Sequence, residues 1–131
     1  MSVTVERIPD EPIIVLRYQG FMDVATVVEA FTKSGVLAAN IEGTVFRIAD
    51  VREADSTFVE VMNIIKASRS TAGSTTDNKF RVIFVGDNQL IRFYMQIVQN
   101  LGAPPLHIFH TLEDALEYIK LERAKQPTSA N

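Results

Sequence analysis

The residues best suited to chemistry in this 131-residue chain gather in a short polar stretch after the apolar run VFRIA. Asp50 ends that run, and an amphipathic segment opens at Phe58. A carboxylate at the end of a strand can hold a cation or accept a phosphoryl group. A hydroxyl at the start of a helix can carry a phosphate, because the free N–H groups there favour negative charge. The stretch is therefore a candidate phosphoacceptor or interaction surface, made of Asp50, Arg52, Asp55, Ser56 and Thr57.

A purely structural role is the alternative for the same residues. The segment Thr57-Phe58-Val59-Glu60 has the form of a capping box, in which Thr57 accepts a backbone hydrogen bond and Glu60 reaches back, together worth roughly 1 kcal/mol. Since caps occur on most helices, capping is favoured over phosphoregulation. Asp50 and Arg52 are likewise expected to hold a turn by local hydrogen bonds.

No enzyme signature accompanies this stretch. The chain has no GxGxxG or GxxxxGK[ST] loop for phosphate, no GxSxG elbow for a serine nucleophile, and no cysteine. Its two histidines, His107 and His110, flank a predicted strand and should point in different directions, so we expect a structural or solvent-facing role. The sequence therefore predicts no catalytic residue, no metal and no cofactor.

A phosphorylation-receiver domain also carries an aspartate at the end of a parallel strand. Its Mg²⁺ ion needs an acidic pair after the first strand, and a lysine follows the last strand. Here Gln19-Gly20 follows the run IIVLRY, and Thr111 follows LHIFH. Two of the three elements are therefore missing, and the receiver hypothesis is rejected.

Three arginines define a second candidate site. Alternation along the central strands places Arg17, Arg47 and Arg81 each with apolar neighbours two residues away. One face of the sheet is then richer in charge than a fully covered face tolerates, so helices should cover the two faces unequally; the alternative is that arginines at strand ends reach water. These arginines are a candidate anion-binding face.

The elements that must position these residues follow from hydrophobic periodicity and turn signals. They predict one α/β domain over residues 1–124, with a mixed, mainly parallel sheet in the order β-β-α-β-α-β-α-β-α, and a flexible tail over 125–131. A mobile loop is expected at Ser70–Lys79. The strands are expected near Val3–Ile8, Ile13–Tyr18, Val45–Asp50, Phe80–Val85 and Leu106–His110, and the helices near Asp23, after Thr57, after a cap at Asp87 or Asn88, and after Thr111.

Composition limits the partners. A net charge of −3 opposes non-specific binding to nucleic acid, whose phosphates need a basic surface. No run of 18 apolar residues predicts a membrane span, and no signal peptide opens the chain. A cytoplasmic protein is expected.

The order of elements resembles the STAS or SpoIIAA-like family over nearly the whole chain. The resemblance rests on RYQGFMD before the first helix, a strand ending in DVR, and FRVIFVGDNQLIRFYMQIVQNLG before the last strand. In the family's anti-sigma factor antagonists, a partner kinase phosphorylates a serine in an Asp-Ser-Ser-Gly motif. Here Asp55, Ser56 and Thr57 match that motif, and Phe58 stands where the family has glycine.

The resemblance implies a non-catalytic regulatory domain with a protein partner, of which an anti-sigma factor kinase is one kind. It leaves a homodimer open. The alternative is a binding module for a small anion or metabolite, which would use the arginine face or the polar turns at the carboxyl ends of the strands.

Overall fold

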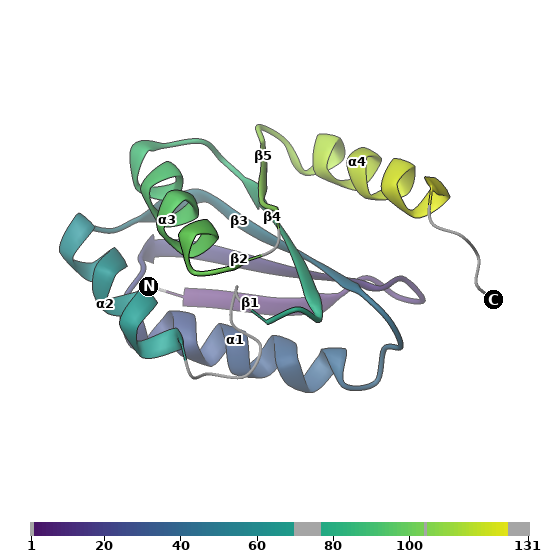
Figure 1. The fold of residues 1–131 in the computed structure, drawn as a ribbon, viewed down its shortest axis with the longest axis horizontal. Coiled ribbons are helices and arrows are strands. Elements are labelled where there is room, and N and C mark those ends of the chain that lie inside the picture. Colours follow the sequence, from purple (N-terminus) through teal and green to yellow (C-terminus); the bar gives the residue numbers. More distant parts are fainter. Residues whose placement is uncertain (1, 70–76, 104, 126–131) are drawn as a thin grey trace.

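The structure, a computed structural model, describes residues 2–69, 77–103 and 105–125 (Figure 1). Five strands and four helices alternate in the predicted order, which confirms the α/β class. The predicted loop lies outside the described residues except for Asp77–Lys79, and so does the predicted tail except for Lys125, the last residue of the final helix. The elements are β1 Ser2–Arg7, β2 Ile13–Phe21, α1 Val24–Ala38, β3 Val45–Asp55, α2 Phe58–Ser68, β4 Phe80–Val85, α3 Gln89–Asn100, β5 His107–Phe109 and α4 Leu112–Lys125.

The strands form one mixed sheet in the order β1-β2-β3-β4-β5. β1 runs antiparallel to β2, and the other neighbours are parallel, as predicted. Because each parallel strand leads into a helix, the starts of α1, α2 and α3 all lie near the carboxyl edge of the sheet.

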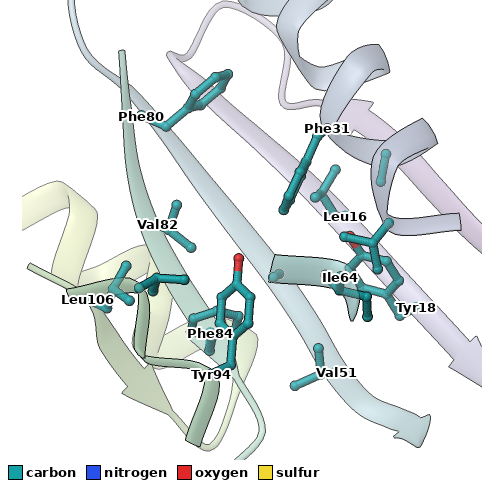
Figure 2. Packing of buried hydrophobic residues seen from close by; sticks show 14 of the residues in the cluster. Leu16, Tyr18, Phe31, Val51, Ile64, Phe80, Val82, Phe84, Tyr94 and Leu106 are labelled. Atoms are coloured by element: carbon teal, nitrogen blue, oxygen red, sulfur yellow. The ribbon is translucent and has the colours of Figure 1, made fainter. Parts of the chain in front are cut away.

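The helices cover the two faces of the sheet unequally, which confirms the prediction. α1, α2 and α3 pack on one face, which we call the three-helix face, while α4 alone packs on the other, the α4 face. On the three-helix face, side chains of the sheet and the helices converge on one core (Figure 2). The α4 face has a smaller core, made of Ile13, Val15, Phe46, Ile48, Ile83, Val85, Ala115 and Ile119.

β3 is longer than its apolar pattern indicates. It was expected to end at Asp50 but continues to Asp55, and β2 likewise continues to Phe21. Beyond the end of β4, these two extensions pair with each other, with Gln19 opposite Glu53, and Gln19 also lies opposite Ser2 of β1. The extra residues are mostly polar, so hydrophobic periodicity could not mark them as a strand.

A bulge interrupts this pairing. Arg17 lies opposite Asp50 and Gln19 lies opposite Glu53, so between these pairs β3 has two residues where β2 has one. The Asp50 carboxylate accepts a hydrogen bond from the Arg52 backbone N–H at 3.2 Å. The expected polar turn after Asp50 is therefore a bulge inside a strand.

Candidate functional site

Three helix starts lie at the carboxyl edge of the sheet, and each has a side-chain cap. Asp23, Thr57 and Asn88 precede α1, α2 and α3, and each accepts the backbone N–H three residues later, at 2.9, 3.1 and 2.9 Å. The predicted cap at Thr57 is confirmed. Each cap satisfies one of the backbone donors that a helix leaves free in its first turn.

The two candidate hydroxyls at the start of α2 have different surroundings. Ser56 is buried, and its hydroxyl donates to the carbonyl oxygen of Met22 at 3.1 Å. Its backbone N–H donates to the Asp55 carboxylate at 2.8 Å. Thr57 is exposed. Ser56 therefore ties the β3–α2 junction to the β2–α1 junction, and Thr57 is the hydroxyl that a partner can reach.

Glu60 does not complete the predicted capping box. Its Oε2 accepts the backbone N–H of Val24 at 3.0 Å, and its Oε1 accepts the Asn63 side-chain amide at 3.4 Å. The start of α1 lies beside α2. The Glu60 carboxylate therefore accepts the first free backbone N–H of α1 instead of the backbone N–H of Thr57. That half of the capping-box prediction is wrong, because the sequence of α2 does not show which helix lies next to it.

Asp50 and Arg52 form a local ion pair, as predicted, but within the bulge rather than a turn. Arg52 Nε lies 3.0 Å from Asp50 Oδ1, and Nη2 lies 2.7 Å from Oδ2. Burial by itself would raise the pKa of Asp50. The hydrogen bonds from the Arg52 side chain and backbone outweigh this effect, so the pKa of Asp50 is lowered. Asp50 follows Ile48 by two residues and so faces α4.

The five candidate residues therefore do not form one site. Asp50 and Arg52 pair on the α4 face, whereas Asp55, Ser56 and Thr57 lie at the start of α2. Gly86 packs against the bulge with a φ of +111°, and a Cβ atom built there would lie 3.1 Å from the Arg52 backbone nitrogen. Glycine is required at that position for both reasons.

The candidate anion-binding face is wrong, because the three arginines do not share a face. Arg47 lies on the three-helix face and is only 1% exposed, while Arg17 and Arg81 are exposed. The predicted alternation of side chains holds within each strand. The register between neighbouring strands, however, decides which residues of different strands share a face of the sheet. The register pairs Arg17 with Asp50 and Arg81 with Phe46, and these partners point away from the Arg47 side of β3.

Arg47 is held by aromatic rings and a hydroxyl. Its guanidinium carbon lies 4.6 and 4.3 Å from the ring centroids of Phe31 and Phe80, and its Nη1 donates to Ser34 Oγ at 3.0 Å. Burial lowers the pKa of Arg47 to about 10, against the opposing influence of Tyr18, Tyr94 and Asp77. Arg47 still carries its charge at neutral pH.

Exposed apolar side chains follow Thr57 in the chain, and another lies at the end of β2. Phe58 and Val59 are 49% and 72% exposed, and Phe21, at the end of the β2–β3 ribbon, is 42% exposed. Phe58 meets Phe93 of α3 edge-on, with ring centroids 5.1 Å apart. We call Thr57, Phe58 and Val59 the α2-start surface.

Sequence reasoning identified Thr57 but missed the exposed Phe58 and Val59 beside it. The signal was present in Val59, which lies two residues before Val61 and therefore cannot share its buried side of the helix. An apolar residue so placed, directly after a cap, points to solvent.

Two cavities lie behind this surface. The outer one has a volume of about 280 Å³ and lies between the β3–α2 junction and the start of α3, with Ser56 and Asn88 in its wall. The inner one, of about 50 Å³, lies beneath the helices of the three-helix face. Four residues line both cavities, namely Met22, Val51, Leu90 and Ile91.

The histidines do not converge on a common site. His107 Nε2 lies 2.9 Å from the Tyr118 hydroxyl, and His110 is exposed beyond the end of β5. Within the described ranges, no three His, Asp or Glu side chains gather as metal ligands. None of the helices seen in those ranges has the length and apolar character needed to cross a membrane.

No protein-family model and no curated protein matches the chain. Two solved structures are similar to it. An uncharacterised protein of the DUF3478 family with a SpoIIAA-like fold, from Shewanella loihica PV-4, is 16% identical with a TM-score of 0.61, over 89% of this chain and 91% of that one. The anti-sigma factor antagonist SpoIIAA in its unphosphorylated form is 15% identical with a TM-score of 0.57, over 91% and 98%. Together with the order of strands and helices, these likenesses show that the chain has the SpoIIAA-like fold.

Proposed function

We propose that the chain is a non-catalytic regulatory domain that binds a protein partner through the α2-start surface. The observation that carries the proposal is the exposure of Phe58 and Val59 beside an exposed Thr57 at a helix start. The likeness to an anti-sigma factor antagonist supports it, because that protein shares the fold over most of both chains.

The apolar side chains supply the affinity. Burying a valine or phenylalanine side chain contributes about 1.5–3 kcal/mol when it was fully exposed before. Val59 is mostly exposed, and Phe58 is half-exposed against Phe93, so both have apolar area left to bury. Since α2 is anchored by Glu60 and Ser56, it presents these side chains without prior ordering.

Thr57 supplies the regulation. Its exposed hydroxyl caps α2, and a phosphate there would meet the free N–H groups and the positive end of the helix dipole. The added charge would lie beside Phe58 and Val59, where an apolar contact must lose water. Ser56 suits this role less well, because its hydroxyl is buried and donates to Met22.

An anti-sigma factor kinase is the partner to test first. We would screen anti-sigma factor kinases for binding to this chain and then measure the affinity by calorimetry, using Val59→Asp and the control Val36→Asp. Val36 is 66% exposed but lies in the second half of α1. We expect Val59→Asp to weaken binding at least about tenfold, or roughly 1.4 kcal/mol, and Val36→Asp to leave it unchanged. Equal affinities for all three proteins would overturn the proposed surface.

A further inference from the structure

Another cavity lies on the α4 face, at the edge of the sheet where the parallel strands begin. It has a volume of about 190 Å³ and lies between the start of β4, the start of β5 and residues 118–122 of α4. Since the α2-start surface lies at the opposite, carboxyl edge of the sheet, this cavity is independent of the proposed function. Its volume is below the roughly 300–1,000 Å³ of pockets for drug-sized ligands, so it suits a small metabolite.

Four polar side chains among the described residues converge on this cavity, namely Arg81, His107, Tyr118 and Glu122. Tyr118 and Glu122 are four residues apart and therefore lie on one side of α4. The Tyr118 hydroxyl lies 2.9 Å from His107 Nε2, and the two rings lie with their centroids 4.7 Å apart. Burial raises the pKa of Tyr118, Glu122 adds to the increase and Arg81 opposes it, so both charges lie close to this hydroxyl.

Arg81 and Glu122 carry opposite charges but do not pair with each other. The Arg81 guanidinium donates no hydrogen bond to any part of the chain that the structure describes. Glu122 Oε2 lies 3.3 Å from Lys125 Nζ, but the Lys125 side chain is 75% exposed, so that ion pair contributes little. The cavity therefore presents a cation on β4 and a carboxylate on α4, each able to take a further partner.

The rest of the wall is apolar. It consists of Phe46, Val82, Ile83 and Pro105. Phe46 and Ile83 belong to the core of the α4 face, so their positions are fixed by packing. An apolar group of a ligand that lies against this wall is removed from water, which is favourable.

We propose that this cavity binds a small α-amino acid with an apolar side chain. The carboxylate of the ligand pairs with Arg81, whose planar guanidinium can donate two parallel hydrogen bonds to a carboxylate. The ammonium group pairs with Glu122, and the side chain lies against the apolar wall.

A zwitterion matches both charges at once. An anion without an ammonium group is attracted by Arg81 but repelled by Glu122, and an amine without a carboxylate meets the reverse. A neutral ligand would remove water from both charged groups and give neither a charged partner, which is costly. The pair of opposite charges therefore favours an amino acid over each of these simpler ligands.

The test uses the full chain and three probes of similar shape, which are L-valine, 3-methylbutanoate and 2-methylpropan-1-amine. The second lacks the ammonium group of valine, and the third lacks its carboxylate. Amide chemical shifts follow each titration. Arg81→Gln and Glu122→Gln each remove one charge, while Arg17→Gln and Glu117→Gln are matched controls at exposed positions outside the cavity. Thermal unfolding of each variant checks that it is folded.

We expect L-valine to bind saturably with a Kd below about 1 mM, and the other two probes to bind at least about tenfold more weakly. The shifts should centre on Arg81, His107 and Tyr118. Arg81→Gln and Glu122→Gln should each weaken the binding of L-valine at least about tenfold, and the two control variants should leave it unchanged. Glu122→Gln should also narrow the difference between L-valine and 3-methylbutanoate, because it removes the repulsion of the anion.

Three results would overturn the proposal. One is that L-valine does not bind to saturation. Another is that 3-methylbutanoate or 2-methylpropan-1-amine binds as tightly as L-valine, which would show that only one of the two charges takes part. The third is that Arg81→Gln and Glu122→Gln bind L-valine as well as the control variants do.

Discussion

The Glu60 carboxylate of α2 accepts the backbone N–H of Val24, the first residue of α1, at 3.0 Å. One side chain thereby satisfies a free donor at the start of a helix that lies 36 residues earlier in the chain. Together with the Ser56 bond to Met22, this contact fixes the start of α2 against the β2–α1 junction. The position of the α2-start surface therefore depends on bonds made by its buried neighbours.

Removing this contact should destabilise the fold. We expect Glu60→Ala to lower the free energy of unfolding by about 1–2 kcal/mol, because it deletes a charge-assisted hydrogen bond at a partly buried helix start. Urea denaturation measures the change. Glu42→Ala, at an exposed position between α1 and β3, is the control and should stay within about 0.5 kcal/mol. Equal losses for the two variants would show that the Val24 bond does not contribute.

Replacing the three arginines by alanine should lower the stability of the fold by very different amounts. We expect Arg47→Ala to cost about 2–4 kcal/mol, since it empties a buried site between Phe31 and Phe80. Arg17→Ala and Arg81→Ala, at exposed positions, should each cost less than about 0.5 kcal/mol. Similar costs for all three would contradict their placement on different faces.

The sequence predicted the elements better than their relative placement. Apolar runs marked β2, the first half of β3, and β4, and polar residues near Asp23, Thr57 and Asn88 marked three helix starts, although Asp87 and Asn88 could not be told apart as the cap. These features depend on neighbours within a few residues along the chain, so local patterns reveal them.

The remaining features depend on contacts between distant segments. Strand register places Arg47 on the other face of the sheet from Arg17 and Arg81, and no pattern within one strand specifies that register. Likewise, Ser56 is buried because the carbonyl of Met22 lies beside it, which the local sequence of α2 does not show. The inner cavity likewise lies between strands and helices that are far apart in the sequence, so no local pattern indicates it.

Acid should weaken the bulge in β3. The pKa of Asp50 is lowered in the folded chain, so the ion pair with Arg52 stabilises the fold above the ordinary aspartate pKa of about 3.9 and is lost as the pH falls through the lower folded value. Carbon-detected NMR titration of the Asp50 carboxyl measures this directly. We expect a pKa below about 3.9, which should rise in Arg52→Met. An unchanged pKa in that variant would contradict the role of Arg52.

Gly86 should tolerate alanine less well than Gly43 does. Both have positive φ values, +111° and +78°, but a Cβ atom at Gly86 meets the Arg52 backbone, whereas Gly43 has open space around it. We expect Gly43→Ala to cost about 1 kcal/mol from backbone strain, and Gly86→Ala about 2–4 kcal/mol from strain and crowding together. Thermal unfolding compares the two. A smaller loss at Gly86 than at Gly43 would contradict the close packing of the bulge.

Thr57 tests the central claim, that the α2-start surface binds a protein under the control of charge. Asparagine and aspartate both cap helices, so Thr57→Asn and Thr57→Asp should leave stability nearly unchanged and differ from each other chiefly in charge. The most direct measurement is calorimetric binding of these two variants to an anti-sigma factor kinase that binds the original chain. We predict that Thr57→Asn binds like the original chain and that Thr57→Asp binds at least about tenfold more weakly, a difference of roughly 1.4 kcal/mol. Equal affinities for the two variants would contradict the claim.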